Sequence, residues 1–328
     1  MSANPTIVRA IFRSVRVPGL TAPNDTAHVK IYYPGASTHG EAERNSGMVA
    51  CAKGAGPYPV VILFPGINVG PEGFAWLAHF LVARGFVVVT YSLIGEEFPG
   101  LVSLTPGLDL SALGPNDYGM RPSSLALQPI LDDLAVCHQT GLLAGQLDLA
   151  RIALGGHSAG GTTALVNANP AWFKGVRSVF AYGAHTAAAT MLGHPEGTMN
   201  AICPQVAVMI LGGDADGVIA QSAARYGDPV GDTMGRVVAT FDQALSRDNN
   251  DCYLAILKGC NHFSIAHPLD HATGRGFLDQ SETLSNAREL LGALIGAFLS
   301  DTLACQDSAD LWVQVEARRD DLALFRRR

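Results

Sequence analysis

The sequence has few charged residues, and those it has are scattered. Charged residues make up 16% of the 328 positions, the net charge is −7, and no basic cluster precedes the terminal FRRR. Nucleic-acid-binding proteins carry basic patches on one face, so we expect no nucleic-acid partner. Apolar residues make up 48%, which is enough for a large core, and we expect a single domain over residues 1–328.

The sequence has little that would suit a membrane. The longest apolar run in its C-terminal half, Leu290–Leu299, is far shorter than the roughly 20 residues that a spanning helix needs. Near the N-terminus, Arg9, Arg13 and Arg16 stand where a signal peptide would be apolar. We therefore expect a cytoplasmic protein without a membrane span.

Metal-binding and redox motifs are missing as well. None of the six cysteines forms a C-x-x-C pair, the spacing typical of zinc sites and redox centres. Acidic and histidine residues show no ligand-like spacing apart from Asp214 and Asp216, so we expect no metal and no cofactor. Cys203 and Cys252 each stand at the start of an expected strand, where a pairing is conceivable, but buried free thiols are favoured.

What the sequence does contain is an alternation of apolar strands and amphipathic helices. Two half-exposed strands open it, and six apolar strands follow, at residues 6–17, 28–34, 59–66, 86–92, 151–156, 176–183, 203–213 and 252–259. Helical patterns occupy residues 74–85, 123–141, 159–169 and 281–303. This alternation predicts an α/β fold with a mostly parallel central sheet of about eight strands flanked by helices.

Two long connections interrupt the alternation. Residues 93–122 are apolar and rich in Gly and Pro, and we expect a lid or a substrate-binding loop there. The alternative is a surface excursion whose leucines pack on the core. Residues 35–57 lack periodicity and are expected to form an exposed loop. Ser123 or Ser124 is the expected N-cap of the helix that follows the longer connection.

A serine stands between glycines where an expected strand meets an expected helix. The run Gly156-His157-Ser158-Ala159-Gly160 matches the G-x-S-x-G pattern of a nucleophile elbow. The sharp turn directs the serine hydroxyl away from the sheet, which makes Ser158 the expected nucleophile. The N–H of Ala159 opens the helix, where unpaired donors favour negative charge, as an oxyanion requires. The side chain of His157 is expected to pack beneath the turn.

A serine nucleophile needs a base, and the base needs an acid that orients it. The expected order along the chain is serine, acid, histidine, each just past a strand end. One expected strand ends before Asp214 and Asp216, and the next ends before His262. The residues alone leave the choice between the two acids open. His267 and His271 lie in the following loop and are expected to be solvated or bonded to backbone.

From about residue 59 to residue 263, the sequence resembles the serine α/β-hydrolase superfamily. The stretches FPGINVG, DLARIALGGHSAGG and KGCNHF are most similar to the branch of chlorophyllases, platelet-activating-factor acetylhydrolase-like esterases and cutinase-like polyester hydrolases. The resemblance implies an α/β-hydrolase fold. GGDADGVI resembles a loop of dienelactone-hydrolase-related enzymes that uses the later acid, which implies Asp216, and GCNHF matches their G-x-x-H-F, which implies His262.

The sequence also departs from its relatives. Dienelactone hydrolase has Cys at the position of Ser158, whereas haloalkane dehalogenases and epoxide hydrolases have Asp, so lactone specificity is not implied and those other reactions are disfavoured. An H-G-G-G run is absent, which disfavours the hormone-sensitive-lipase branch. The stretch from Asp216 to His262 is longer than in a compact member, and we expect residues 217–250 to form a second insertion with a helix of its own.

The remaining site residues follow from the same comparison. The second oxyanion donor should come from the loop after the strand at residues 59–66, which makes the N–H of Ile67 the candidate, with Asn68 nearby. His185 stands where this branch often places a residue beside the substrate, although an ordinary loop histidine is an equal alternative. The expected substrate contacts are therefore Asn68, His185 and Phe263, the last of which directly follows the expected base.

The function that this pattern favours is hydrolysis of a carboxylic ester through an acyl-enzyme intermediate. Because the connection at residues 93–122 is apolar, we expect an apolar substrate, either a small molecule or a polymeric ester. Amide hydrolysis, peptide hydrolysis or acyl transfer would use the same residues. A non-catalytic binding protein on this fold is a further alternative, although such proteins can lose a triad member and this sequence retains all three.

Overall fold

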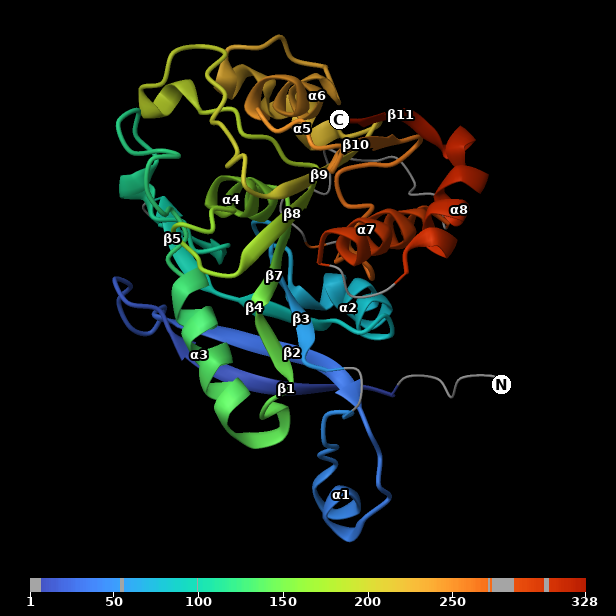
Figure 1. Cartoon of the computed structure of the whole chain (residues 1–328). Helices are drawn as coiled ribbons and strands as arrows, with labels where there is room; N and C mark the ends of the chain where they lie inside the picture. Colours follow the sequence, from blue (N-terminus) through green and yellow to red (C-terminus); the bar gives the residue numbers. More distant parts are fainter. Residues whose placement is uncertain (1–6, 54–55, 99, 271, 273–285, 304–306) are drawn as a thin grey trace.

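The computed structural model describes residues 7–53, 56–98, 100–270, 272, 286–303 and 307–328 (Figure 1). Its centre is a nine-stranded sheet in the order β1-β2-β4-β3-β7-β8-β9-β10-β11. In chain order, these strands are β1 (Ile7–Arg16), β2 (Thr26–Gly35), β3 (Tyr58–Phe64), β4 (Val87–Ser92), β7 (Leu147–His157), β8 (Val176–Tyr182), β9 (Ala207–Gly213), β10 (Cys252–Leu257) and β11 (Leu322–Arg327).

The six central strands, β4 to β10 across the sheet, run parallel to one another. Their apolar runs are buried because helices cover both faces of a parallel sheet. The β1–β2 hairpin extends one side of the sheet in antiparallel pairing, and β11 extends the other. The α/β class with a mostly parallel sheet is therefore confirmed.

The sheet has one strand more than expected. The additional strand, β11, comes from the C-terminal segment and pairs with β10, with Ala255 opposite Phe325. Its sequence, LALFRR, is short and ends in two charges, so it lacks the long apolar run that marked the other strands. An edge strand needs only one partner and is often charged, which explains the weak signal.

Helices cover the two faces of the sheet and divide the core into two clusters. The eight helices of the described residues are α1 (Glu41–Ser46), α2 (Ala75–Val82), α3 (Leu127–Gln139), α4 (Ala159–Asn167), α5 (Gly217–Ser222), α6 (Gly235–Ala239), α7 (Ala287–Leu303) and α8 (Ala309–Ala317). Buried side chains of α3, α4 and α6 pack on one face, and those of α2, α7 and α8 pack on the other.

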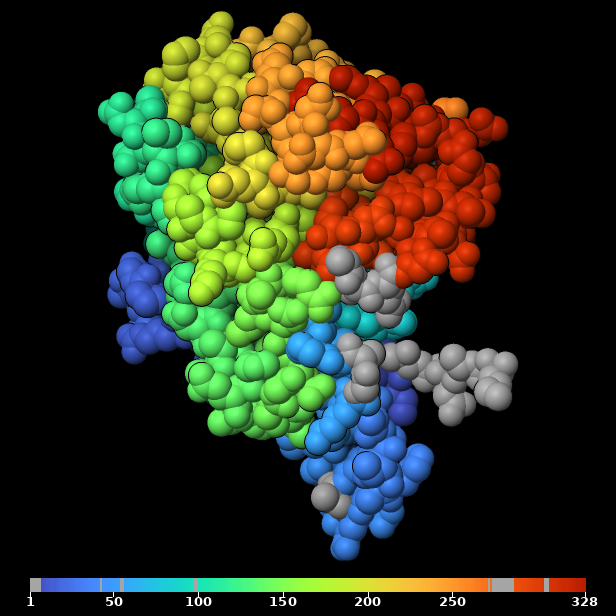
Figure 2. Space-filling model, in the orientation of Figure 1, coloured from blue at the N-terminus to red at the C-terminus, as the bar shows by residue number. Residues whose placement is uncertain are grey.

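Two expectations about local structure need correction, and a third is not tested. Residues 35–57 are not all loop, because α1 forms within them and projects from the lower end of the molecule in Figure 2. The helix after residue 122 begins at Leu127, and its N-cap position is Ala126. Ser124 still contributes, since its Oγ accepts a hydrogen bond from the Leu127 N–H at 3.3 Å. The start of the expected helix at 281–303 lies outside the described residues.

The two long connections carry secondary structure. Within residues 93–122, β5 (Ile94–Phe98) and β6 (Leu101–Leu104) form a separate two-stranded hairpin. Within residues 217–250, α5 and α6 are followed by one turn of π-helix at Thr240–Ala244. Figure 2 shows the second connection, in gold, at the upper end of the molecule, opposite α1, and the first, in teal, along the upper left side.

The cysteines do not pair within the described residues. Cys203 and Cys252 are both free, as are the three other described cysteines. Burial raises the pKa of the Cys252 thiol to about 11, so this thiol stays protonated at neutral pH.

Candidate active site

Ser158 occupies a strained turn between β7 and α4. Its backbone angles are φ 54° and ψ −127°, a region that residues with a side chain rarely adopt. A Cβ added at Gly156 would lie 2.4 Å from the Gly160 carbonyl oxygen, and one added at Gly160 would lie 2.3 Å from the Pro65 oxygen. The turn therefore requires glycine at both flanking positions, as the sequence pattern indicated.

Asp216 and His262 form a buried pair beside this turn. The Nδ1 atom of His262 lies 2.8 Å from Oδ2 of Asp216, and the two side chains are 2% and 1% exposed. The second carboxylate oxygen of Asp216 accepts the Ile219 N–H at 2.8 Å, which also caps α5. Because a carboxylate accepts hydrogen bonds, Nδ1 carries the proton and Nε2 is left as the basic nitrogen.

Asp214 has a different set of partners. Its Oδ1 accepts the Gly259 N–H at 2.7 Å, and its carbonyl accepts a hydrogen bond from the Thr233 hydroxyl at 2.9 Å. The carboxylate thus ties the loop after β9 to the loop after β10. Of the two acids that the sequence left open, Asp216 contacts the histidine and Asp214 holds the loops.

The side chain of His157 lies beneath the turn and contacts the backbone and the ring of His262. Its ring is fully buried, its Nε2 lies 2.8 Å from the His262 carbonyl oxygen, and the two imidazole rings are 4.7 Å apart. Burial lowers the pKa of His157 well below its usual value, and the neighbouring His262 lowers it further. His157 is therefore neutral, with its proton on Nε2 donated to that carbonyl. The sequence placed this side chain beneath the turn but did not reveal its contact with the His262 backbone.

The two expected oxyanion donors follow neighbouring strands. In the register of β3 and β7, Phe64 pairs with Gly156, so Ile67 and Ala159 each lie three residues beyond a paired position. Ala159 is the first residue of α4, where a helix has no internal acceptor for its N–H. A Cβ on Gly66 would lie 3.3 Å from the Ser158 Cβ, so the backbone just before Ile67 packs closely against the serine.

Asn68, one of the three expected substrate contacts, is bonded within the protein. Its N–H donates to the Leu104 carbonyl at 3.1 Å, and its Oδ1 accepts the Leu104 N–H at 3.1 Å. It therefore joins the loop after β3 to the β5–β6 hairpin.

Phe263, the second of them, is 4% exposed. Its ring packs edge-on against His262 at 5.2 Å and His157 at 6.0 Å. The contacts of this side chain are with the two histidine rings that flank the site, so it helps to hold them in place.

His185, the third expected substrate contact, is 5% exposed. Its ring lies edge-on to that of Tyr226 at 4.6 Å, and its Nδ1 accepts the Ala187 N–H at 3.2 Å. Burial lowers its pKa to about 3, with smaller contributions in the same direction from Arg236 and His262. Its burial, its neutral state and these partners indicate that His185 has a structural role.

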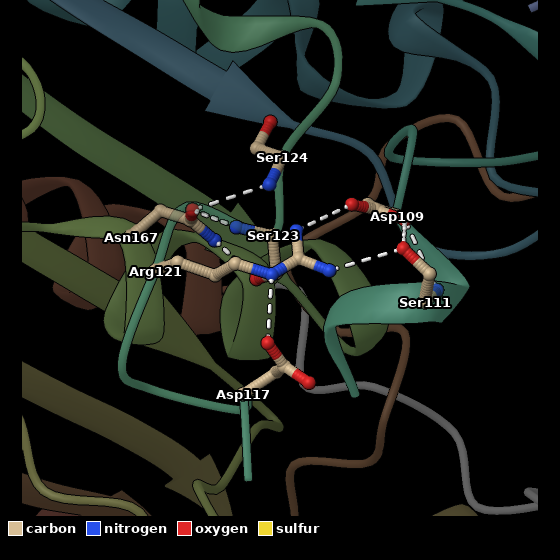
Figure 3. Close-up of polar contacts among 7 residues, drawn as sticks. All are labelled: Asp109, Ser111, Asp117, Arg121, Ser123, Ser124 and Asn167. Carbon is tan, nitrogen blue, oxygen red and sulfur yellow. Dashed lines mark hydrogen bonds and ion pairs between the residues drawn. The ribbon is translucent and has the colours of Figure 1, made fainter. Parts of the chain in front are cut away.

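The polar network in Figure 3 fastens the end of the long connection to α4. Asn167, at the end of α4, accepts hydrogen bonds from the N–H groups of Ser123 at 2.8 Å and Ser124 at 3.2 Å. Its amide donates to the Ser123 hydroxyl at 2.9 Å. Sequence reasoning missed this role, because an asparagine in the helical run ALVNAN gives no sign of its distant partners.

The Arg121 guanidinium organises the connection itself. It contacts the carboxylates of Asp109 at 2.7 Å and Asp117 at 3.1 Å, and the Ser111 hydroxyl at 3.0 Å (Figure 3). Because these partners all belong to residues 109–121, the contacts hold the loop in one shape independently of the body of the molecule. Arg121 is partly exposed, so we assign this cluster a structural role.

A cleft of about 600 Å³ lies between α5 and α6. Its lining includes Ile219, Asp228 and Arg236 but none of Ser158, Asp216 and His262. We assign this cleft no part in the reaction.

Within the described residues, no group of three or more His, Cys, Asp or Glu side chains is arranged to hold a metal ion. No helix in the same part of the chain has the length and apolar character needed to cross a membrane.

Comparisons with known proteins gave no relatives: neither the models of protein families nor the curated proteins contain a match to this chain.

Proposed function

We propose that the protein is a serine hydrolase that cleaves carboxylic esters. The observation that carries the proposal is the buried hydrogen bond of 2.8 Å between His262 and Asp216, at the strand ends beside a serine held at φ 54°. Such a serine is activated when an oriented imidazole takes its proton.

We include the α/β-hydrolase fold in this proposal. Three features support it: the serine follows β7, the acid follows β9 and the histidine follows β10, all at the carboxyl ends of parallel strands. Ligands of open parallel sheets bind at these ends.

In the proposed reaction, the Ser158 hydroxyl oxygen attacks the acyl carbon while Nε2 of His262 takes its proton. Asp216 stabilises the imidazolium that forms. The N–H groups of Ile67 and Ala159 donate to the negatively charged oxygen of the tetrahedral intermediate. His262 then protonates the leaving alcohol, and a water molecule, activated by the same histidine, releases the acid and regenerates Ser158.

The substrate is proposed to be an apolar ester, of a small molecule or a polymer. Support comes from exposed apolar side chains on the connection after β4, which are Ile94, Leu101, Val102, Leu110 and Met120. Single exposed apolar residues are ordinary, but a group on one segment near a reaction site is typical of a binding surface.

A fluorophosphonate probe and a Ser158→Ala variant test the proposal. The wild-type protein should be labelled covalently and should hydrolyse p-nitrophenyl esters, most rapidly at a chain length that fits its pocket. The Ser158→Ala variant should lose labelling and about 10⁴–10⁶ in kcat, with an unchanged circular dichroism spectrum. More than a few per cent of wild-type activity in that variant would contradict the mechanism. Turnover of matched amides in the same assay distinguishes an amidase from an esterase.

A further inference from the structure

The loop that carries Ile67 is fastened to the β5–β6 hairpin through its neighbour Asn68. The Asn68 N–H donates to the Leu104 carbonyl, and the Leu104 N–H donates to Asn68 Oδ1, both at 3.1 Å. The two bonds close a ring, much as two opposed strand residues exchange both of their hydrogen bonds. One of the acceptors here is a side-chain amide, so the ring depends on the identity of residue 68.

Asn68 also determines the shape of the turn. The turn spans Gly66 to Val69 and is closed by a hydrogen bond of 3.2 Å from the Val69 N–H to the Gly66 carbonyl. Its third residue, Asn68, has φ 56°, a left-handed conformation that asparagine tolerates better than other residues with a side chain. The direction of the Ile67 N–H is set within this turn.

The elbow holds the turn from the other side. A Cβ on Gly66 would lie 2.8 Å from Nδ1 of His157 and 3.3 Å from the Ser158 Cβ. The turn is thus packed between the serine elbow and the hairpin. Displacing either support would change where the Ile67 N–H points.

The hairpin is a fixed support because its two flanks are bonded to each other and one of them is bonded to β4. The Thr105 N–H donates to the Leu93 carbonyl at 2.9 Å, and the Tyr91 hydroxyl donates to the Pro106 carbonyl at 2.7 Å. Further along, Asn167 holds the end of the connection on α4 (Figure 3). These contacts argue against free hinging of the whole connection.

We propose that Asn68 is a positioning residue of the oxyanion hole, which holds the Ile67 N–H toward the reacting oxygen through its paired hydrogen bonds with the β5–β6 hairpin. This inference rests on the proposed function. Removing one oxyanion donor costs about 10²–10³ in kcat. Loosening a donor that is still present costs less, and we expect about a tenfold loss.

Two substitutions at residue 68 separate the side-chain bond from the backbone shape. The Asn68→Gly variant accepts the left-handed conformation but loses the Oδ1 acceptor. The Asn68→Asp variant keeps both an acceptor oxygen and tolerance of that conformation. The matched control is Asn250→Gly. Asn250 is exposed and also left-handed, at φ 63°, but it lies just before the amino end of β10, whereas Asn68 follows the carboxyl end of β3.

The assay measures kcat and KM for p-nitrophenyl butyrate and the inhibition constant of a trifluoromethyl ketone that forms a tetrahedral adduct with Ser158. For Asn68→Gly we expect kcat to fall about tenfold with KM unchanged, and the ketone affinity to fall by the same factor. Asn68→Asp should recover most of the loss. Asn250→Gly should match the wild-type protein. A purely structural role would lower the melting temperature without this parallel loss of kcat and ketone affinity.

Three results would overturn the inference: kcat of Asn68→Gly within twofold of wild type, an equal loss in Asn68→Asp, or a fall in kcat without a fall in ketone affinity. In each of these cases the proposed function survives, because wild-type turnover and Ser158 labelling are measured independently. A wild-type protein that neither hydrolyses esters nor reacts with fluorophosphonate overturns both proposals before any variant is compared.

Discussion

At the scale of single residues, the proposed base is held at three points. Asp216 binds its Nδ1, the His157 ring binds its carbonyl, and the Tyr182 hydroxyl donates to the carbonyl of the preceding residue, Asn261, at 2.6 Å. Gly183 allows this close packing, since a Cβ there would lie 3.0 Å from the His262 Nδ1. An imidazole that is fixed before the substrate arrives loses little entropy during the reaction.

The two aspartates near this histidine provide a residue-scale prediction. Asp216→Asn should lower kcat about 10⁴-fold, because an amide that donates to Nδ1 stabilises the wrong imidazole tautomer. Asp214→Asn should cost far less, and mainly through stability, because Asp214 bonds the Gly259 N–H. The measurement is kcat of both variants on one ester, with circular dichroism to verify folding. A dead Asp214→Asn variant beside an active Asp216→Asn variant would reverse this assignment.

The residues alone could not decide between these two acids. Both follow the same strand, and their separation of two positions is small compared with the freedom of a loop. The decision depends on the hydrogen bonds that each carboxylate makes in the folded chain. Asp214 accepts the N–H of Gly259, in a distant loop, whereas Asp216 accepts the N–H of Ile219 and so caps α5. By contrast, the elbow was predictable, because its G-x-S-x-G pattern is a short local motif and the steric exclusion at Gly156 comes from Gly160 within that motif.

At the scale of elements, the strands with continuous apolar runs were predictable and the connections were not. The β5–β6 hairpin contains Gly95, Glu96 and Glu97, and no alternation of apolar and polar residues marks its strands. Its pairing with Asn68 and its fixed flanks are tertiary contacts, which override local propensity. The same holds for the π-helical turn at Thr240–Ala244.

The junction between α4 and the connection gives an element-scale prediction. Asn167→Ala should lower the free energy of unfolding by about 2–4 kcal/mol, because it leaves the buried N–H groups of Ser123 and Ser124 without acceptors. Asn169→Ala is the matched control. The Asn169 side chain accepts one local bond, from the Ala171 N–H at 2.9 Å, so its loss should cost less than about 1 kcal/mol. Urea unfolding of the three proteins measures both values, and equal losses would contradict the role of Asn167.

At the scale of the whole molecule, two buried histidines make the free energy of unfolding depend on pH. The pKa of His157 is lowered well below its usual 6.5, and that of His185 is lowered to about 3, chiefly by burial. Below about pH 6.5 the unfolded chain binds protons that the folded protein excludes, so folding loses stability as the pH falls. Each histidine contributes a loss of about 1.4 kcal/mol per pH unit until its folded pKa is reached.

We therefore expect acid sensitivity before the carboxylates titrate. From about pH 6.5 to about pH 5, His185 should remove about 2 kcal/mol from the free energy of unfolding, and His157 should add a loss in the same direction. Urea titrations at several pH values in this range measure the slope. A His185→Phe variant should show a shallower slope, because it lacks one of the two groups. A stability that is constant across this range would show that the two rings are accessible to protons.

The position of β11 has a consequence for synthesis on the ribosome. Strand β10 leads directly into the loop of His262, yet its outer edge pairs with β11, which lies at residues Leu322–Arg327. Until that segment has left the exit tunnel, β10 presents its unpaired N–H and C=O groups, the arrangement that invites association between nascent chains. The pairing that protects this edge thus forms only after about 60 further residues have been translated beyond His262.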